Sequence, residues 1–332
     1  FRSNGLEGLS ERTKAFGLKL GLWLEPEMVS PDSELNRTHP EWCLSVPGRT
    51  ATLSRAQRVL DMTREDVQEY LFEVICAILD STGIRYIKWD MNRHSCALGA
   101  QQHAFVLGLY DVLRRIFLPR PQILLESCSS GGNRFDCGML WFSPQIWCSD
   151  DTDAIERLEI QEGTALIYPL CSMGAHVSVC PNHTVGRVTP FTTRGHVALA
   201  GTFGYELDIT KLPEEERKLI PEQTAMYHKY HELIREGEYY RILSSRENHR
   251  SDCWAVASED KSEVLVTYVQ VLAQANMPSR KVRLRGFDPA KKYRLEGTDE
   301  VYSGEMLMNA GFRMKDFWGD FVSRLYHFVA VD

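Results

Sequence analysis

The chain of 332 residues has no long apolar run. No apolar stretch reaches the roughly 18 residues that a membrane-spanning helix requires, and Phe1 opens no charged-then-apolar leader. Positive charge is not in excess either, because 38 basic side chains face 45 acidic ones and the formal net charge is −7. We therefore expect neither a membrane nor nucleic acid as the main partner, since both present negative charge.

Paired cysteine spacing is missing as well. The nine cysteines include no C-x-x-C pair, whereas a disulfide framework or a structural zinc site needs clustered pairs. His176 and His183 are seven residues apart, which fits no metal-ligand spacing. We expect free thiols in the reducing cytoplasm, and neither a metal nor another cofactor. The cysteines are Cys43, Cys76, Cys96, Cys128, Cys137, Cys148, Cys171, Cys180 and Cys253.

Motifs of nucleotide-binding proteins and of serine hydrolases are absent too. The sequence contains no G-x-G-x-x-G, no G-x-x-x-x-G-K-[ST] and no G-x-S-x-G. The Gly-rich stretch 129–132 (S-S-G-G) has none of these spacings. These absences count against a doubly wound sheet with a phosphate-binding turn and against a Ser-His-Asp hydrolase.

Short apolar runs alternate with helical patterns up to about residue 237. Functional groups at the C-terminal ends of many strands are typical of a (β/α)8 barrel, so the α/β barrel is favoured over an open sheet. Six of eight barrel units are recognisable, and we expect residues 1–237 to be a partial (β/α)8 barrel whose N-terminal strands are missing from this chain. The six strand candidates end near Glu25, Asp90, Glu126, Asp150, His176 and Asp208.

Helices are predicted over residues 63–82, 101–117 and 213–236. In the first, apolar residues recur at three- and four-residue steps. Thr63 with Asp66 resembles a capping box, and Gly83 is placed as a C-cap. Residues 238–332 instead consist of short alternating segments separated by turn residues, which predicts a small antiparallel β-sandwich domain.

Two strand-end carboxylates, Asp90 and Asp150, are the candidate catalytic pair. They end the second and fourth strands of the series, and alternate barrel strands contribute side chains to one layer. Two facing carboxylates are the equipment of a glycosidase, with one as nucleophile and the other as acid/base. Lys88 is expected to keep Asp90 ionised, and the acidic residues after Asp150 to favour a retained proton.

Structural interpretations of the same residues stay open. Asp150 to Asp153 also suit a helix N-cap, and Lys88 could be a plain ion-pair partner. Tryptophans near the strand ends suit the apolar face of a sugar but equally suit the core. They are Trp23, Trp89, Trp141 and Trp147.

Four ordered motifs resemble the α-galactosidases of glycoside hydrolase family 36. They are G-L-W-L-E-P-E-M-V at 21–29, K-W-D-M-N-R at 88–93, E-S-C-S-S-G-G at 126–132 and Q-I-W-C-S-D at 145–150. The resemblance implies a retaining exo-α-galactosidase acting on raffinose- and melibiose-type sugars, with a barrel and a C-terminal β domain. It makes Asp90 the nucleophile and Asp150 the acid/base.

The resemblance also implies roles for six residues in binding galactose. Lys88, Asn92 and Arg55 would bond sugar hydroxyls, Trp23 would stack on the substrate, and Cys128 with Gly131 would line the pocket. Departures from the family pattern at Leu24, Asn133 and Cys148 bear on fine specificity. The family's Asp-Asp-Gly-Trp motif and N-terminal β-sandwich do not occur in this chain, which therefore reads as truncated at its N-terminus.

The expected substrate is an α-galactoside oligosaccharide. Two alternatives to its hydrolysis stay open. One is a galactosyl transferase of the raffinose- or stachyose-synthase kind, which shares the first chemical step. The other is an inactive galactoside-binding fragment, because part of the sugar-binding equipment is missing. The resemblance further suggests a homo-oligomer.

Overall fold

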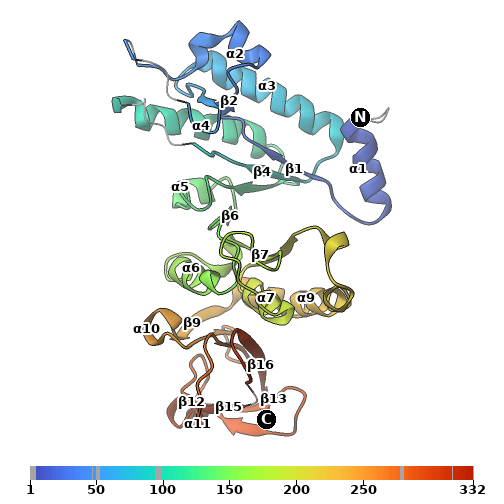
Figure 1. Cartoon of the computed structure of the whole chain (residues 1–332), viewed down its shortest axis with the longest axis vertical. Helices are drawn as coiled ribbons and strands as arrows, with labels where there is room; N and C mark the ends of the chain where they lie inside the picture. Colours follow the sequence, from blue (N-terminus) through green and yellow to red (C-terminus); the bar gives the residue numbers. More distant parts are fainter. Residues whose placement is uncertain are drawn as a thin grey trace. The chain divides into compact units, whose positions relative to one another are not determined.

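The computed structural model describes residues 5–46, 48–49, 53–93, 99–276, 280–315 and 317–331. The chain forms two compact units, Phe1–Trp147 and Cys148–Asp332, and each is treated by itself below (Figure 1). Over the described ranges, no helix is both long enough and apolar enough to cross a bilayer. The eight cysteines in these ranges are free, as predicted, and Cys96 lies outside them.

The first unit is built on a parallel sheet. Its strands are β1 (Gly21–Leu24), β4 (Tyr86–Trp89), β5 (Leu124–Ser127) and β6 (Gln145–Trp147), paired in that order. The register sets Trp23 opposite Lys88, Lys88 opposite Glu126, and Glu126 opposite Gln145. This row of aligned residues brings together side chains from four strands that are far apart in the sequence.

Two long amphipathic helices cover this sheet, α3 (Glu65–Thr82) and α4 (Gln102–Phe117) (Figure 1). The prediction of a helix over 101–117 is confirmed, and so is the C-cap at Gly83, which has a left-handed φ of 64°. The capping box at Thr63 is wrong, because the Thr63 amide and hydroxyl both donate to Asp61 Oδ1 and the helix starts two residues later. The remaining elements of the unit are α1 (Gly5–Ala15), β2 (Met28–Val29), α2 (Glu34–Thr38), β3 (Arg58–Val59) and α5 (Cys137–Leu140).

The second unit begins with parallel strands β7 (Met173–Ser178) and β8 (Thr202–Glu206), which complete the six predicted strands. Helices α6 (Glu156–Ala165) and α7 (Phe191–Ala198) accompany them. The helix predicted over 213–236 is confirmed from residue 220 to its end at 236, but it is not a single helix. It is divided into α8 (Glu214–Arg217) and α9 (Ile220–Glu236), because Pro221 occupies the first turn of α9, where a proline starts a helix rather than continuing one.

An antiparallel β structure follows residue 237 in the same unit. Six strands pair in the order β14-β13-β16-β11-β10-β9, and β12 pairs with β15 in a second, small sheet. The strands that the sequence predicts here, over 253–257, 263–271, 281–284, 293–296 and 324–331, correspond to β10, β11, β12, β13 and β16. The strands β9, β14 and β15 were not predicted, and the last two are only three residues long. The elements are β9 (Glu238–Leu243), α10 (Ser245–Asn248), β10 (Ser251–Ala257), β11 (Glu263–Gln270), β12 (Arg280–Val282), β13 (Lys292–Leu295), β14 (Val301–Ser303), α11 (Gly304–Asn309), β15 (Phe312–Met314) and β16 (Val322–Val331).

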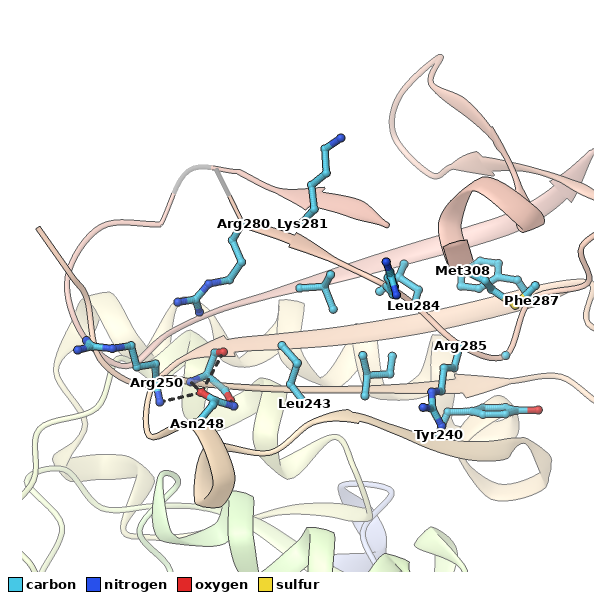
Figure 2. A pocket seen from close by; sticks show the side chains of 15 residues that line it. Tyr240, Leu243, Asn248, Arg250, Arg280, Lys281, Leu284, Arg285, Phe287 and Met308 are labelled. Atoms are coloured by element: carbon cyan, nitrogen blue, oxygen red, sulfur yellow. Dashed lines mark hydrogen bonds between the residues drawn. The ribbon is translucent and has the colours of Figure 1, made fainter. Parts of the chain in front are cut away.

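A groove of about 990 Å³ lies in this β structure (Figure 2). Its floor is apolar, and among the described residues that line it none is acidic. Figure 2 shows Lys281 pointing away from the floor, and Arg280 donates to the Tyr268 hydroxyl. The groove is thus a basic feature in an acidic chain. Its basic residues are Arg250, Arg280, Lys281, Arg283 and Arg285.

Polar contacts hold the β structure to the helices of the second unit. Arg241 of β9 donates to Glu162 of α6 at 2.7 Å, and His196 Nδ1 of α7 lies 2.8 Å from Ser323 Oγ of β16. Burial lowers the pKa of His196 to about 4, with a smaller contribution from the positive charge of Arg324. His196 is therefore neutral at physiological pH, and this contact carries no ionic charge.

The buried carboxyl group of Asp252 on β10 should make the stability of the protein depend on pH. Burial raises its pKa to about 6, although Ser245 donates to it through its amide and hydroxyl, both at 3.0 Å. Glu162 also raises the pKa of Asp252, and Arg241 lowers it. Because the folded value exceeds the unfolded one, this group favours folding below about pH 4, and that contribution is lost as pH rises through 6.

The Asp252→Asn variant should therefore be more stable than wild type at pH 8, by up to about 3 kcal/mol, since 1 pKa unit corresponds to about 1.4 kcal/mol. Asparagine keeps an acceptor for Ser245 without the buried charge. Urea unfolding of both proteins at pH 4 and pH 8 measures the difference. An equal difference at the two pH values would contradict the buried-carboxyl explanation.

Candidate active site

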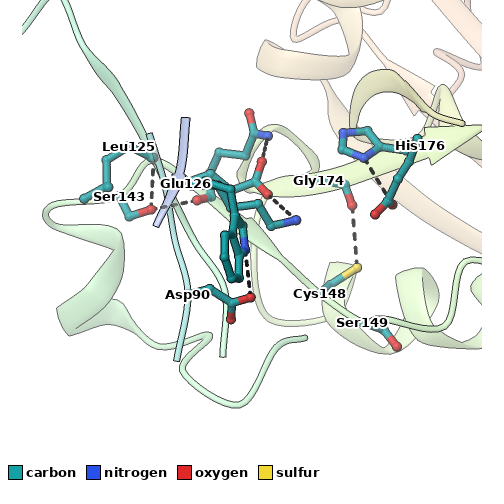
Figure 3. A network of polar contacts seen from close by, with 12 residues as sticks. Asp90, Leu125, Glu126, Ser143, Cys148, Ser149, Gly174 and His176 are labelled. Atoms are coloured by element: carbon teal, nitrogen blue, oxygen red, sulfur yellow. Dashed lines mark hydrogen bonds and ion pairs between the residues drawn. The ribbon is translucent and has the colours of Figure 1, made fainter. Parts of the chain in front are cut away.

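Asp90 follows β4 and is 5% exposed. Three N–H groups donate to its carboxylate: the Met91 amide to Oδ1 at 2.8 Å, and Trp23 Nε1 and Asn92 Nδ2 to Oδ2 at 3.1 and 2.7 Å. These donors fix both oxygens. Figure 3 shows Asp90 accepting one of these bonds. The structure thus brings together three of the residues named from the sequence, Trp23, Asp90 and Asn92.

Glu25, at the end of β1, ties this group to the chain around residue 57. Its Oε1 accepts from Asn92 Nδ2 at 2.6 Å and its Oε2 from Gln57 Nε2 at 3.0 Å. Arg93 Nη1 in turn donates to the Gln57 carbonyl at 2.6 Å. Glu25 was recognised as a strand-end carboxylate, but its orienting contact with Asn92 was not predicted, because the partner is 67 residues away.

Lys88 pairs with Glu126 and not with Asp90. Lys88 Nζ lies 3.2 Å from Glu126 Oε1 and 4.6 Å from the centre of the Trp147 ring, and Gln145 Nε2 donates to the other oxygen of Glu126. We predicted that Lys88 keeps Asp90 ionised, but its ion pair is with Glu126. The cross-strand register explains the change, since it places Glu126 directly opposite Lys88.

The four tryptophans divide by exposure. Trp23 is 52% exposed and Trp141 lies at the surface, whereas Trp89 and Trp147 are buried and belong to the core interpretation. Trp89 Nε1 donates to Glu27 Oε1 at 2.8 Å from beneath the site. Only Trp23 combines an exposed ring with a bond to Asp90.

Cys128 and Gly131 belong to a tight turn beside Asp90. The Cys128 amide donates to the Trp89 carbonyl at 2.8 Å, and the Met91 amide donates to the Cys128 carbonyl at 3.1 Å. Ser130 and Gly131 have positive φ values of 48° and 84°, which a glycine adopts at no steric cost. Burial, with the negative charge of Asp90, raises the pKa of Cys128 to about 12, so its thiol stays neutral.

Arg55 lies in a second turn, between Ser54 and Gln57. The Gln57 amide donates to the Ser54 carbonyl at 3.0 Å, and both central residues, Arg55 and Ala56, have a left-handed φ, of 52° and 56°. Non-glycine residues rarely take this conformation, and they cluster at functional sites. Within the described residues the exposed Arg55 side chain makes no ion pair or hydrogen bond.

Asp150 opens the second unit, in a segment fixed by a chain of short turns. The Asp151 amide donates to Ser149 Oγ, and the Asp153 amide to Asp151 Oδ1, both at 3.0 Å. Asp153 Oδ1 caps α6 by accepting from the amides of Ile155 and Glu156, and it also pairs with Arg187. Asp153 is thus the helix cap that the sequence allowed, while Asp150 itself is exposed.

The remaining strand-end candidates make ordinary structural contacts. His176 Nδ1 lies 3.7 Å from Glu206 Oε2, and Asp208 Oδ1 accepts from the Thr210 amide at 3.0 Å. Across the residues that the structure describes, no group of three or more His, Cys, Asp or Glu side chains could hold a metal ion.

Family models cover most of the chain. The Melibiase model matches residues 2–237, and the model of the glycosyl hydrolase family 36 C-terminal domain matches residues 251–328. α-Galactosidase AgaA of Geobacillus stearothermophilus is 49% identical over 99% of this chain and 46% of its own length. α-Galactosidase Mel36A of Lactobacillus acidophilus is 45% identical over 99% of this chain and 46% of its own length.

Solved structures agree. The crystal structure of AgaA from Geobacillus stearothermophilus has a TM-score of 0.95 over 99% of this chain and 47% of that one. A doubly substituted variant of AgaA in complex with raffinose has a TM-score of 0.96, at 49% identity and the same coverage. The chain belongs to the α-galactosidases of glycoside hydrolase family 36. Its fold is therefore that of a (β/α)8 barrel, of which six strands occur here, followed by an antiparallel β domain. The chain spans about half the length of the curated relatives it matches.

Proposed function

We propose that this chain carries the catalytic centre of a retaining exo-α-galactosidase that hydrolyses terminal α-galactosyl residues of raffinose- and melibiose-type sugars. The observation that carries the proposal is the Asp90 carboxylate, nearly buried and held at both oxygens by three N–H donors beside an exposed tryptophan ring. Relatives that are 49% and 45% identical to this chain are α-galactosidases, and substituted variants of AgaA have been crystallised with raffinose and with stachyose.

The proposed reaction is a double displacement. An Asp90 oxygen attacks the anomeric carbon while the bond to the leaving oxygen breaks, and Asp150 gives that oxygen a proton. Water then attacks the same carbon, Asp150 takes a proton from it, and the bond to Asp90 breaks. Galactose leaves with its original anomeric configuration, and both carboxyl groups return to their starting states.

The other site residues are proposed to bind galactose. Lys88 and Asn92 carry N–H donors next to Asp90 and can bond sugar hydroxyls, as can the exposed Arg55 guanidinium. The exposed Trp23 ring offers a face for the apolar side of the sugar. Cys128, as a neutral thiol, and Gly131, without a side chain, are proposed to shape the wall of the pocket.

The extent of the domains and the location are also proposals. We propose that residues 1–237 are the partial catalytic barrel and residues 238–332 a C-terminal β-sandwich domain. The switch from parallel to antiparallel pairing supports this boundary. The free thiols in the described residues support a cytoplasmic location.

The stereochemistry of the first product tests the proposal. Hydrolysis of an aryl α-galactoside, followed by proton NMR before mutarotation, should give α-galactose first. β-Galactose as the first product would exclude the double displacement. The same reaction with sucrose present separates a transferase, which would yield raffinose, from a hydrolase. Absence of any turnover, with binding of galactose retained, would support the non-catalytic alternative.

A further inference from the structure

We propose that Arg157 is the positioning residue of Asp150, so that the helix after the acid/base carboxylate sets its place. This inference rests on the proposed function, because it assigns a role to a residue that acts through the proposed acid/base. Arg157 lies on α6 and is 3% exposed. No motif or spacing in the sequence pointed to it.

The guanidinium of Arg157 holds the main chain on both sides of Asp150. Its Nη2 donates to the Ser149 carbonyl at 2.7 Å, and its Nε donates to the Asp151 carbonyl at 2.6 Å. Its Nη1 lies 2.9 Å from Cys148 Sγ and 3.2 Å from the Gly174 carbonyl on β7. One rigid, planar group therefore fixes residues 148, 149 and 151 and ties them to a strand of the sheet.

Figure 3 shows Cys148 pointing to the Gly174 carbonyl on β7, with Ser149 next along the chain. Asp150 itself is exposed, whereas Asp90 is nearly buried. A general acid must approach the leaving oxygen to about 2.6–3.2 Å, and a displacement of about 1 Å can cost about 100-fold in rate. The bonds from Arg157 to the Ser149 and Asp151 carbonyls hold the backbone of Asp150 in place, which burial does not do for this exposed residue.

Arg187, between β7 and α7, offers a matched control because it contacts the start of the same helix, α6. It pairs with Asp153 and with Glu156, at 2.9 Å for the latter, but with no residue of 148–151. Arg187 thus supports the helix cap, whereas Arg157 supports the segment that carries the acid/base. Replacing each by lysine removes the planar fork and keeps the charge.

The experiment compares Arg157→Lys with Arg187→Lys on two substrates, using kcat/KM, which reports the steps up to the first bond cleavage. Melibiose needs a proton on its leaving oxygen, and 2,4-dinitrophenyl α-galactoside does not. We expect Arg157→Lys to lose about 100-fold on melibiose and less than about 5-fold on the activated substrate. Arg187→Lys should change both values by the same factor.

Asp150→Ala calibrates the outcome. If this variant loses melibiose activity selectively and Arg157→Lys loses both activities equally, the positioning role is overturned while the proposed function stands. If Asp150→Ala shows no selectivity, the proposed function itself fails. Should Arg157→Lys not fold, Ser149→Ala tests the same segment, because it removes the acceptor of the Asp151 amide. A smaller loss selective for melibiose supports the proposal, and equal losses on both substrates overturn it.

Discussion

Asp90→Asn should lower kcat on 4-nitrophenyl α-galactoside by at least about 10⁴-fold, the size of loss seen when a group of a nucleophilic centre is removed. An amide is a poor nucleophile, so the glycosyl-enzyme bond cannot form at a useful rate. The substitution also places an NH2 donor either at the Oδ1 position, opposite the Met91 amide, or at the Oδ2 position, opposite both Trp23 Nε1 and Asn92 Nδ2. Either orientation breaks bonds that orient the side chain. A variant that keeps more than a tenth of the wild-type rate would remove Asp90 from the mechanism.

Asp208→Asn is the matched control for this loss. Asp208 also follows a strand, but its carboxylate accepts from Thr210 and pairs with Lys211 at the surface. The Asp208→Asn substitution should leave kcat within about 2-fold of wild type, since surface substitutions of this kind have small effects. Thermal unfolding of both variants separates lost chemistry from lost fold.

Rescue by an added nucleophile distinguishes attack by Asp90 from a supporting role. Asp90→Gly opens space at the end of β4, and azide can take the place of the carboxylate in the first step. With an aryl α-galactoside the product should be β-galactosyl azide, because a single displacement inverts the anomeric carbon. If azide does not accelerate cleavage of the aryl α-galactoside by Asp90→Gly, the role of Asp90 is to orient other groups.

The position of Asp90 could be predicted because strand ends are encoded locally. A short apolar run, a polar residue at its end and a following helical pattern locate Asp90 at the mouth of a barrel without any knowledge of its neighbours. The six strands and the helix over 102–117 were predictable for the same reason.

Partners across the sheet could not be predicted, because they depend on register. Lys88 is two residues from Asp90 in the sequence, and side chains at i and i+2 share a face, so their pairing was the natural local expectation. The register instead places Glu126 opposite Lys88, and the lysine forms its ion pair with that buried carboxylate. The contact of Glu25 with Asn92 was missed for the same reason, because it joins the ends of β1 and β4. The contacts of Arg157 depend instead on how α6 packs against the turns that precede it.

The register also places a buried ion pair beneath the site. Glu27 is fully buried and accepts from Arg134 Nη1 at 2.8 and 3.2 Å, as well as from Trp89 Nε1 at 2.8 Å. Arg134 follows the turn that carries Cys128, and Trp89 directly precedes Asp90. The pair therefore joins the β1 end of the sheet to the two segments that place the proposed nucleophile and the wall of its pocket.

Arg134→Met should reduce the free energy of unfolding by about 3–5 kcal/mol, because it leaves the Glu27 carboxylate buried without its counter-charge. Arg120→Met is the matched control: both arginine side chains are 18% exposed, but the partner of Arg120, Asp80, is 64% exposed and that of Arg134 is 0% exposed. The control should cost about 1 kcal/mol or less.

Urea unfolding at pH 8 and pH 5 measures these values, and the Arg134→Met loss should shrink at pH 5, where the unpaired carboxyl can take a proton. Adding Glu27→Gln to Arg134→Met should recover at least about 2 kcal/mol, since a neutral amide still accepts from Trp89. Equal losses for the two arginine variants would show that burial of the partner is not what makes Arg134 important.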